Sequence, residues 1–289
     1  MIIQDLTLNL LNLFMTLNLF MLLATAGSVV HLSKRGTMDV EKQDILSKVP
    51  EVTLIFWITK ILATTLGETG GDAVSMSMSL GYLVSTGIFS VIFIVAVIAQ
   101  VSVKRFHPIL YWTTIIATTT VGTTLADFAD RSLGIGYTGG TAILFALLMT
   151  SLCVWYRTLG SIAVNTVSSP KSEIFYWVTI MFSQTLGTAL GDWTADSAGL
   201  GYSGSAIVFS AILAVIAAAY YRTTISRTAL FWAAFILTRP LGAVVGDFLD
   251  KPISKGGLEV SRYSASAALL VVIASGIFVF PQRAAKQGH

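Results

Sequence analysis

Four aspartates recur at one position of a repeated pattern in an otherwise apolar chain. Asp72, Asp127, Asp192 and Asp247 each follow a tryptophan by fifteen residues and a glycine by five. An ionised side chain in the middle of a membrane costs about 2.5–3.5 kcal/mol on insertion scales. The aspartates are expected in the outer portion of their helices, with Lys60 and Arg239 nearer the middle. Retaining several charged groups within these segments predicts that they face one another, water or a ligand.

Further charged residues share the faces of these aspartates if the segments are helical. Lys60 and Glu68 precede Asp72 at multiples of four residues, and Arg239 precedes Asp247 by eight, so each set follows one face of a helix. We therefore predict an ion- or substrate-binding set of Asp72, Asp127, Asp192, Asp247, Glu68, Lys60, Arg239, Asp130, Asp196 and Asp250. The alternative is that the aspartates end their helices and accept hydrogen bonds from loop amides.

Small residues stand four apart immediately before each aspartate. This spacing allows two membrane helices to approach closely. We predict that these residues pack the helices together and carry the aspartates into the interior: Gly67 and Gly71, Gly122 and Ala126, Gly187 and Gly191, Gly242 and Gly246.

The pattern divides the chain into four tandem repeats. Trp57, Trp112, Trp177 and Trp232 mark the same position in each, and each repeat holds two apolar segments. The first three repeats also share a Gly-Tyr pair ten residues beyond the aspartate, which the fourth lacks. The expected units are an N-terminal helix and linker, then repeats 1 to 4, at 1–49, 50–106, 107–171, 172–226 and 227–289.

The composition is that of a polytopic α-helical membrane protein. Hydrophobic residues make up 54% and charged residues 11%, against about 25% charged in a soluble domain, and the mean hydropathy is +0.77. The fold class expected is all-α, with four parallel two-helix repeats plus an extra N-terminal helix near 6–30, about nine membrane helices in all. An interfacial or cleaved segment is the alternative for 6–30.

Loop charges give an expected orientation. Twelve lysines and arginines lie on one side of the predicted segments and four on the other. Basic loops stay cytoplasmic, so the C-terminus is expected in the cytoplasm and the N-terminus outside. Both ends of each repeat lie on one side, so the repeats run parallel. The tryptophans fall near the cytoplasmic starts of their helices, where interfacial anchoring or packing is expected rather than ligand stacking.

The repeated Trp-x9-Gly-x4-Asp pattern carries a resemblance. With two membrane segments per repeat, the chain resembles a bacterial membrane-protein family of four tandem repeats of unknown function. The stretch FWITKILATTLGETGGD at 56–72 is similar to the first repeat of that family, and the resemblance covers about 50–281. It implies the topology and a bacterial cytoplasmic membrane, and it implies no activity.

Transport of a cation is the function that the acidic residues favour. Carboxylates held close together cannot all ionise cheaply, which suits proton exchange, and their oxygens suit hard divalent metals. Lys60 and Arg239 would be internal counter-ions. Zinc or copper is disfavoured because the three histidines lie near segment ends and there is one cysteine. The expected partners are the bilayer and a proton or metal cation, with no cofactor and no nucleic acid, and homo-oligomerisation stays open.

Three alternatives remain. Lys60 and Arg239 could bind an organic anion, or the polar faces could belong to a membrane scaffold or sensor that transports nothing. An intramembrane aspartyl hydrolase is disfavoured because such enzymes commonly carry Gly-x-Gly-Asp. The residues at the first glycine's position here are Thr69, Thr124, Ala189 and Val244. No enzymatic activity is expected.

Overall fold

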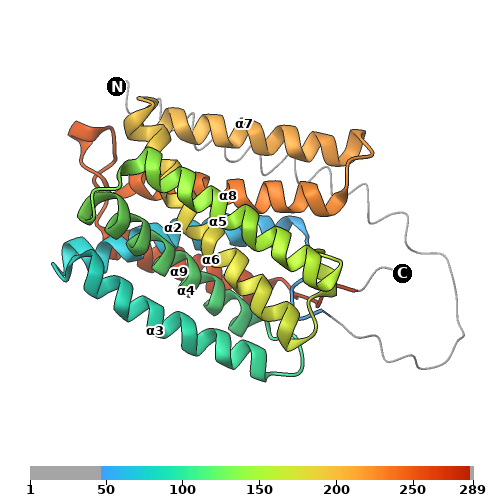
Figure 1. Cartoon of the computed structure of the whole chain (residues 1–289). Helices are drawn as coiled ribbons and strands as arrows, with labels where there is room; N and C mark the ends of the chain where they lie inside the picture. The colour runs from blue at the N-terminus through green and yellow to red at the C-terminus, as the bar shows by residue number, and fades with distance from the viewer. Residues whose placement is uncertain (1–46, 287–289) are drawn as a thin grey trace, which may run out of the picture.

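Eight long helices make up most of residues 47–286, the part of the chain that the computed structural model describes (Figure 1). This confirms the all-helical class. The expected count of about nine is not confirmed, because the predicted helix near 6–30 lies outside the described residues. The helices are α2 (Leu54–Asp72), α3 (Gly81–Ser102), α4 (Pro108–Asp127), α5 (Gly136–Leu159), α6 (Pro170–Asp192), α7 (Gly201–Arg222), α8 (Arg227–Asp250) and α9 (Arg262–Val279).

The first helix of each repeat begins at a side chain that caps it. The Thr53 hydroxyl accepts from the Phe56 amide at the start of α2, and the Ser226 hydroxyl accepts from the Ala229 amide at α8. Ser169 forms a reciprocal capping box before α6. These caps satisfy amides that have no partner inside the helix.

The four capped helices, α2, α4, α6 and α8, form a closed inner ring. Each packs against two ring neighbours, in the order α2, α4, α6, α8 and back to α2. The second helix of each repeat lies outside and packs on the inner helix of the following repeat: α3 on α4, α5 on α6, α7 on α8, and α9 on α2. The last repeat thus closes on the first, and a fourfold arrangement follows.

Aromatic side chains link the inner helices at their N-terminal ends. The residue before each tryptophan touches the tryptophan of the next repeat. The ring centroids lie 5.6 Å apart for Phe56 and Trp112, and 5.7 Å for Phe231 and Trp57. Tyr111–Trp177 and Tyr176–Trp232 complete the circuit. Because all four helices start at this aromatic layer, they run parallel, and the tryptophans pack in the core.

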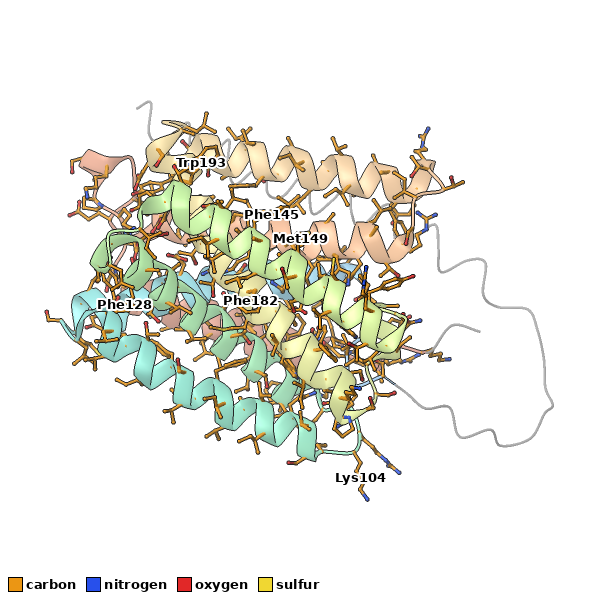
Figure 2. The ribbon with its side chains drawn as sticks, viewed as in Figure 1. Lys104, Phe128, Phe145, Met149, Phe182 and Trp193 are labelled. Carbon is orange, nitrogen blue, oxygen red and sulfur yellow. The ribbon has the colours of Figure 1, made fainter. Side chains whose placement is uncertain are left out.

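The outer helices present apolar side chains to the surroundings. Phe145 on α5 is 54% exposed and is labelled in Figure 2. Five helices, α3, α5, α7, α8 and α9, are long and apolar enough to cross a membrane. The inner helices α2, α4 and α6 carry many threonines, most of which are buried. These features identify a multi-pass membrane protein.

A π-helical turn follows the aspartate in the first three repeats: η1 (Ala73–Ser77), η2 (Phe128–Ser132) and η4 (Trp193–Ser197). The outer helix then begins at a glycine with φ of +75°, +75° or +64°, at Gly81, Gly136 and Gly201. An L side chain rarely adopts this conformation. The Gly of each Gly-Tyr pair is therefore needed to reverse the chain.

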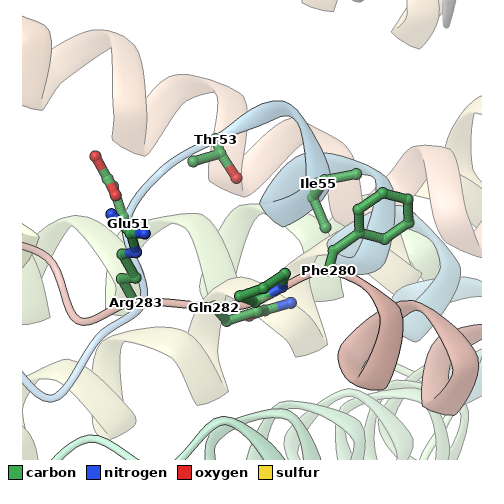
Figure 3. A pocket seen from close by; sticks show the side chains of 7 residues that line it. Glu51, Thr53, Ile55, Phe280, Gln282 and Arg283 are labelled. Carbon is green, nitrogen blue, oxygen red and sulfur yellow. The ribbon is translucent and has the colours of Figure 1, made fainter. Parts of the chain in front are cut away.

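The segments just before α2 and just after α9 cover the aromatic end of the ring. The Glu51 amide donates to the Arg283 carbonyl at 2.8 Å, and the Ala285 amide donates to Val49 at 2.9 Å. The Trp112 indole donates to Gln282 at 2.7 Å. A pocket of about 360 Å³ lies here, between the start of α2 and the end of α9 (Figure 3). It is separated from Asp72 by the length of α2.

Candidate functional site

The four repeated aspartates lie together at the C-terminal ends of the inner helices. We call Asp72, Asp127, Asp192 and Asp247 the carboxylate layer; their exposed fractions are 1–3%. Phe128 and Trp193, which directly follow two of them, mark this end in Figure 2, whereas Lys104 marks the other. Four carboxylates at one buried level require positive charge nearby.

Arg131 holds two of these aspartates on neighbouring helices. Its Nε lies 3.0 Å from Asp127 Oδ1, and its Nη2 lies 3.2 Å from Asp192 Oδ2. The guanidinium also donates to the hydroxyls of Tyr82 and Tyr137. The π turn η2 places Arg131 over the ring, and the two tyrosines belong to the Gly-Tyr pairs.

Lys251 holds the other two aspartates. It lies just past the end of α8, and its Nζ pairs with Asp72 and lies 2.9 Å from Asp247 Oδ1. Arg262 at the start of α9 binds Asp250 at 2.7 Å and lies 3.8 Å from Asp72. The layer is thus divided into two adjacent pairs, each bridged by one cation of the protein.

Lys251 remains charged in this setting. Burial lowers the pKa of the Lys251 ammonium, but the carboxylates of Asp247, Asp72 and Asp250 raise it more, so the pKa lies well above its ordinary value. The same three carboxylates each offer an oxygen within 4.8 Å of the others. This donor set suits a hard divalent cation. In the structure the Lys251 ammonium lies against the same carboxylates.

Arg239 lies deeper, on the axis of the inner ring. Its Nη2 donates to Glu68 Oε2 at 3.0 Å, to Thr123 Oγ1 at 2.6 Å, and to the Thr188 hydroxyl. These residues come from α2, α4 and α6, the three other helices of the ring. Only a group on the axis can reach all three, so Arg239 closes the interior at this level.

The structure does not bring Lys60 to the carboxylates. Its ammonium lies 4.2 Å from the centroid of the Phe235 ring, and no ion pair joins it to an acid within residues 47–286. The residues at the same repeat position are Ile115, Ile180 and Phe235, all fully buried. Lys60 is therefore the one charged member of an otherwise apolar level.

The remaining predicted acids differ in their surroundings. Asp250 joins the Lys251 group, and Asp130 is buried against Gly140 of α5. Asp196 is exposed in η4. It shares no hydrogen bond or ion pair with the carboxylate layer in the described chain. Seven of the eight predicted acids are thus buried, and Asp196 is the exception.

The predicted packing glycines lie against the next inner helix. A Cβ added to Gly67 would meet Thr119, and one added to Gly187 would meet Arg239. At Gly122 the obstacle is backbone, at 3.0 Å from Gln184 C. The other small residues of the set behave similarly or are buried: Gly71, Gly191, Gly242, Gly246 and Ala126. Close approach of the inner helices depends on these positions.

Sequence reasoning missed the cations that bind the carboxylates. Arg131, Lys251 and Arg262 counted only as loop charges. A signal was available, because Arg131 and Lys251 each follow a repeated aspartate by four residues, the spacing of an ion pair within a helix. The hydroxyls of Thr123 and Thr188 were also missed, although both occupy the repeat position of Glu68.

A comparison with known protein families identifies the repeats. The model described as Repeat of Unknown Function (DUF347) matches four times, at residues 55–106, 110–161, 175–226 and 230–283. Together these matches cover well over half of the chain. The chain belongs to the DUF347 family. Each DUF347 repeat comprises one inner and one outer helix here. No curated protein and no solved structure matches the chain.

Proposed function

We propose that this DUF347 protein transports a cation, a proton or a hard divalent metal, through its carboxylate-lined interior. The observation that supports this most strongly is the convergence of one buried aspartate from each repeat on a single level. A scaffold needs no such convergence, since glycine packing alone can hold membrane helices together. Several buried ionisable groups in a membrane protein are typical of ion pathways.

In the proposed cycle, the transported cation displaces the two side chains that bridge the aspartates. Arg131 and Lys251 neutralise the carboxylates while no ligand is bound, and an entering cation competes with them for the same oxygens. A proton neutralises one carboxylate, and a divalent metal takes several oxygens at once. Binding would thereby loosen the contacts between η2, the loop after α8 and the inner ring.

The level of Arg239 favours the proton over a metal as the ion that crosses. A metal ion passing along the axis must approach a fixed guanidinium, which repels it. A proton can instead pass between hydroxyls and Glu68, which accepts from Arg239 and Thr123. Any metal bound at the carboxylate layer would then exchange with protons.

The proposed setting is the bacterial cytoplasmic membrane, with the aromatic end of the ring towards the cytoplasm. The excess of basic residues in the loops at that end supports this orientation. The proposed activity involves no catalytic step. An organic-anion carrier that uses Lys60 and Arg239 is the second candidate. Glu68 already occupies Nη2 of Arg239, so an anion there would use the Nε and Nη1 groups.

Flux through purified protein in liposomes tests the proposal. Wild type would be compared with a variant in which Asp72, Asp127, Asp192 and Asp247 are all asparagine, using a pH dye and a panel of metal-sensitive dyes. The expected result is cation flux in wild type and loss of flux in a variant that still elutes as a folded protein. Absence of flux in wild type, under gradients of either direction, would favour the scaffold.

A further inference from the structure

Hydrogen-bond donors without acceptors gather on the inner ring below the carboxylate layer. Lys60 Nζ, both polar atoms of the Gln184 amide, and Arg239 Nε and Nη1 are buried and have no hydrogen-bond partner within residues 47–286, so donors outnumber the one acceptor, Gln184 Oε1. Lys60, Gln184 and Arg239 are each 0% exposed. Buried donors in folded proteins are almost always satisfied. Their concentration at two adjacent levels points to a ligand that accepts hydrogen bonds.

These donors share one region of the axis. Arg239 reaches all three other inner helices, as its contacts with Glu68, Thr123 and Thr188 require. The Lys60 ammonium lies over Phe235, the residue one helical turn before Arg239 on α8. A turn rises about 5.4 Å, so the two cationic groups lie at adjacent levels. Gln184 lies one turn before Thr188 on the same face of α6.

The charges at these levels do not balance. Glu68 pairs with Arg239, and Lys60 has no carboxylate partner in the described chain. An ammonium at Lys60 is a positive charge without a counter-ion, and burial beside Arg239 disfavours that charged form. A bound anion would stabilise it. The neighbouring residues at the Lys60 level are apolar and fully buried: Ile115, Ile180 and Phe235. The ligand that restores balance is small and carries a single negative charge.

We infer that a small monovalent anion, a halide or the carboxylate of a short acid, binds on the axis between Lys60 and Arg239. Lys60 supplies the charge, the Nε and Nη1 groups of Arg239 supply directed donors, and the Gln184 amide donates from α6. The site lies about two to three helical turns from the carboxylate layer. The inference goes beyond cation transport and holds whether or not the carboxylates move ions.

Equilibrium binding tests this site without any transport readout. Full-length protein in detergent would be dialysed against radiolabelled chloride or acetate, with sodium sulfate keeping the ionic strength constant. Wild type is expected to bind one anion saturably, and competition between chloride and acetate shows which form it prefers. Failure of folded wild type to bind either anion saturably overturns the inference.

Two variants assign the binding to these residues. Lys60→Met is expected to weaken binding at least tenfold, since hydrogen bonds to charged groups are the stronger class. The apolar residues in the other repeats show that this level accepts such a side chain. Gln184→Thr, which places the residue of the first two repeats in the third, is expected to weaken binding about threefold. Lys104→Met, at an exposed lysine beyond α3, is the matched control. Equal binding in wild type, Lys60→Met and Gln184→Thr contradicts the assignment.

Discussion

The two ends of the inner ring are built from the same four repeats in different ways. At the aromatic end every repeat contributes equivalent rings, and each pair of neighbours makes the same contact. Beyond it the symmetry breaks: one repeat supplies Lys60 and Glu68, another Arg131, and the last Arg239 and Lys251. Among the charged residues named here, only the aspartates keep all four copies. The repeated positions therefore build the ring, and the unrepeated charges give its interior a particular chemistry.

The largest expected effect comes from breaking the Arg239–Glu68 pair. Arg239→Gln leaves Glu68 buried without its cation, which is expected to lower the free energy of unfolding by about 3–5 kcal/mol. Gln is the residue at this position in the third repeat. Chemical unfolding in detergent would measure the loss.

The double variant Glu68→Thr with Arg239→Gln sharpens this test. Thr occupies the Glu68 position in the second and third repeats, and no buried charge is left alone. Most of the lost stability is expected to return. If the double variant were less stable than either single variant, the pair would not be the source of the effect.

A smaller loss is expected when an inner contact is overfilled. A Cβ at Gly122 would lie 3.0 Å from backbone atoms of Gln184 and Thr185, which cannot rotate away. Gly122→Ala should therefore cost about 1–3 kcal/mol of unfolding free energy. Gly87→Ala on α3 is the control, since nothing lies within 4 Å of its added Cβ. It should be neutral or stabilising by up to about 1 kcal/mol. Equal costs at both sites would refute close packing as the reason for the inner glycines.

The carboxylates around Lys251 are expected to bind a metal ion more tightly when the ammonium is removed. Lys251→Met removes the ammonium from Asp72, Asp247 and Asp250, whose oxygens lie within 4.8 Å of one another. Mn²⁺ is expected to bind about tenfold more tightly, a change of about 1.4 kcal/mol. Titration calorimetry on purified protein would measure it. Lys255→Met, an exposed neighbour, should leave the affinity unchanged, and a similar gain there would point to a general charge effect.

The smallest expected effect lies at the aromatic end. Gln282→Leu removes the hydrogen bond from the Trp112 indole, 2.7 Å long, and is expected to cost about 1 kcal/mol of stability. Thermal unfolding would detect it. Cation flux should be unaffected, because the contact lies at the end of α4 opposite Asp127. A large change in flux would show that the two ends are coupled.

Repeat periodicity was sufficient to predict the helices, because the same spacing of tryptophan, glycine and aspartate occurs in every repeat. The convergence of the aspartates also followed from parallel repeats. The cations that pair with the aspartates could not be predicted in this way. Arg131 lies in a π turn that returns it over the ring, and Lys251 lies beyond the end of its helix. Local spacing cannot tell whether such a residue turns inward or towards water, and Asp196, at the repeat position of both, is exposed.

The central claim is that cations use the buried carboxylate layer, and one pair of single substitutions tests it most directly. Asp192→Asn removes a buried carboxylate that binds Arg131. Asp196→Asn removes an exposed carboxylate four residues later in the same repeat. Each variant would be reconstituted beside wild type, with equal insertion and thermal stability verified. The account predicts that flux falls at least tenfold in Asp192→Asn and is unchanged in Asp196→Asn. Intact flux in Asp192→Asn, or equal losses in both, would contradict it.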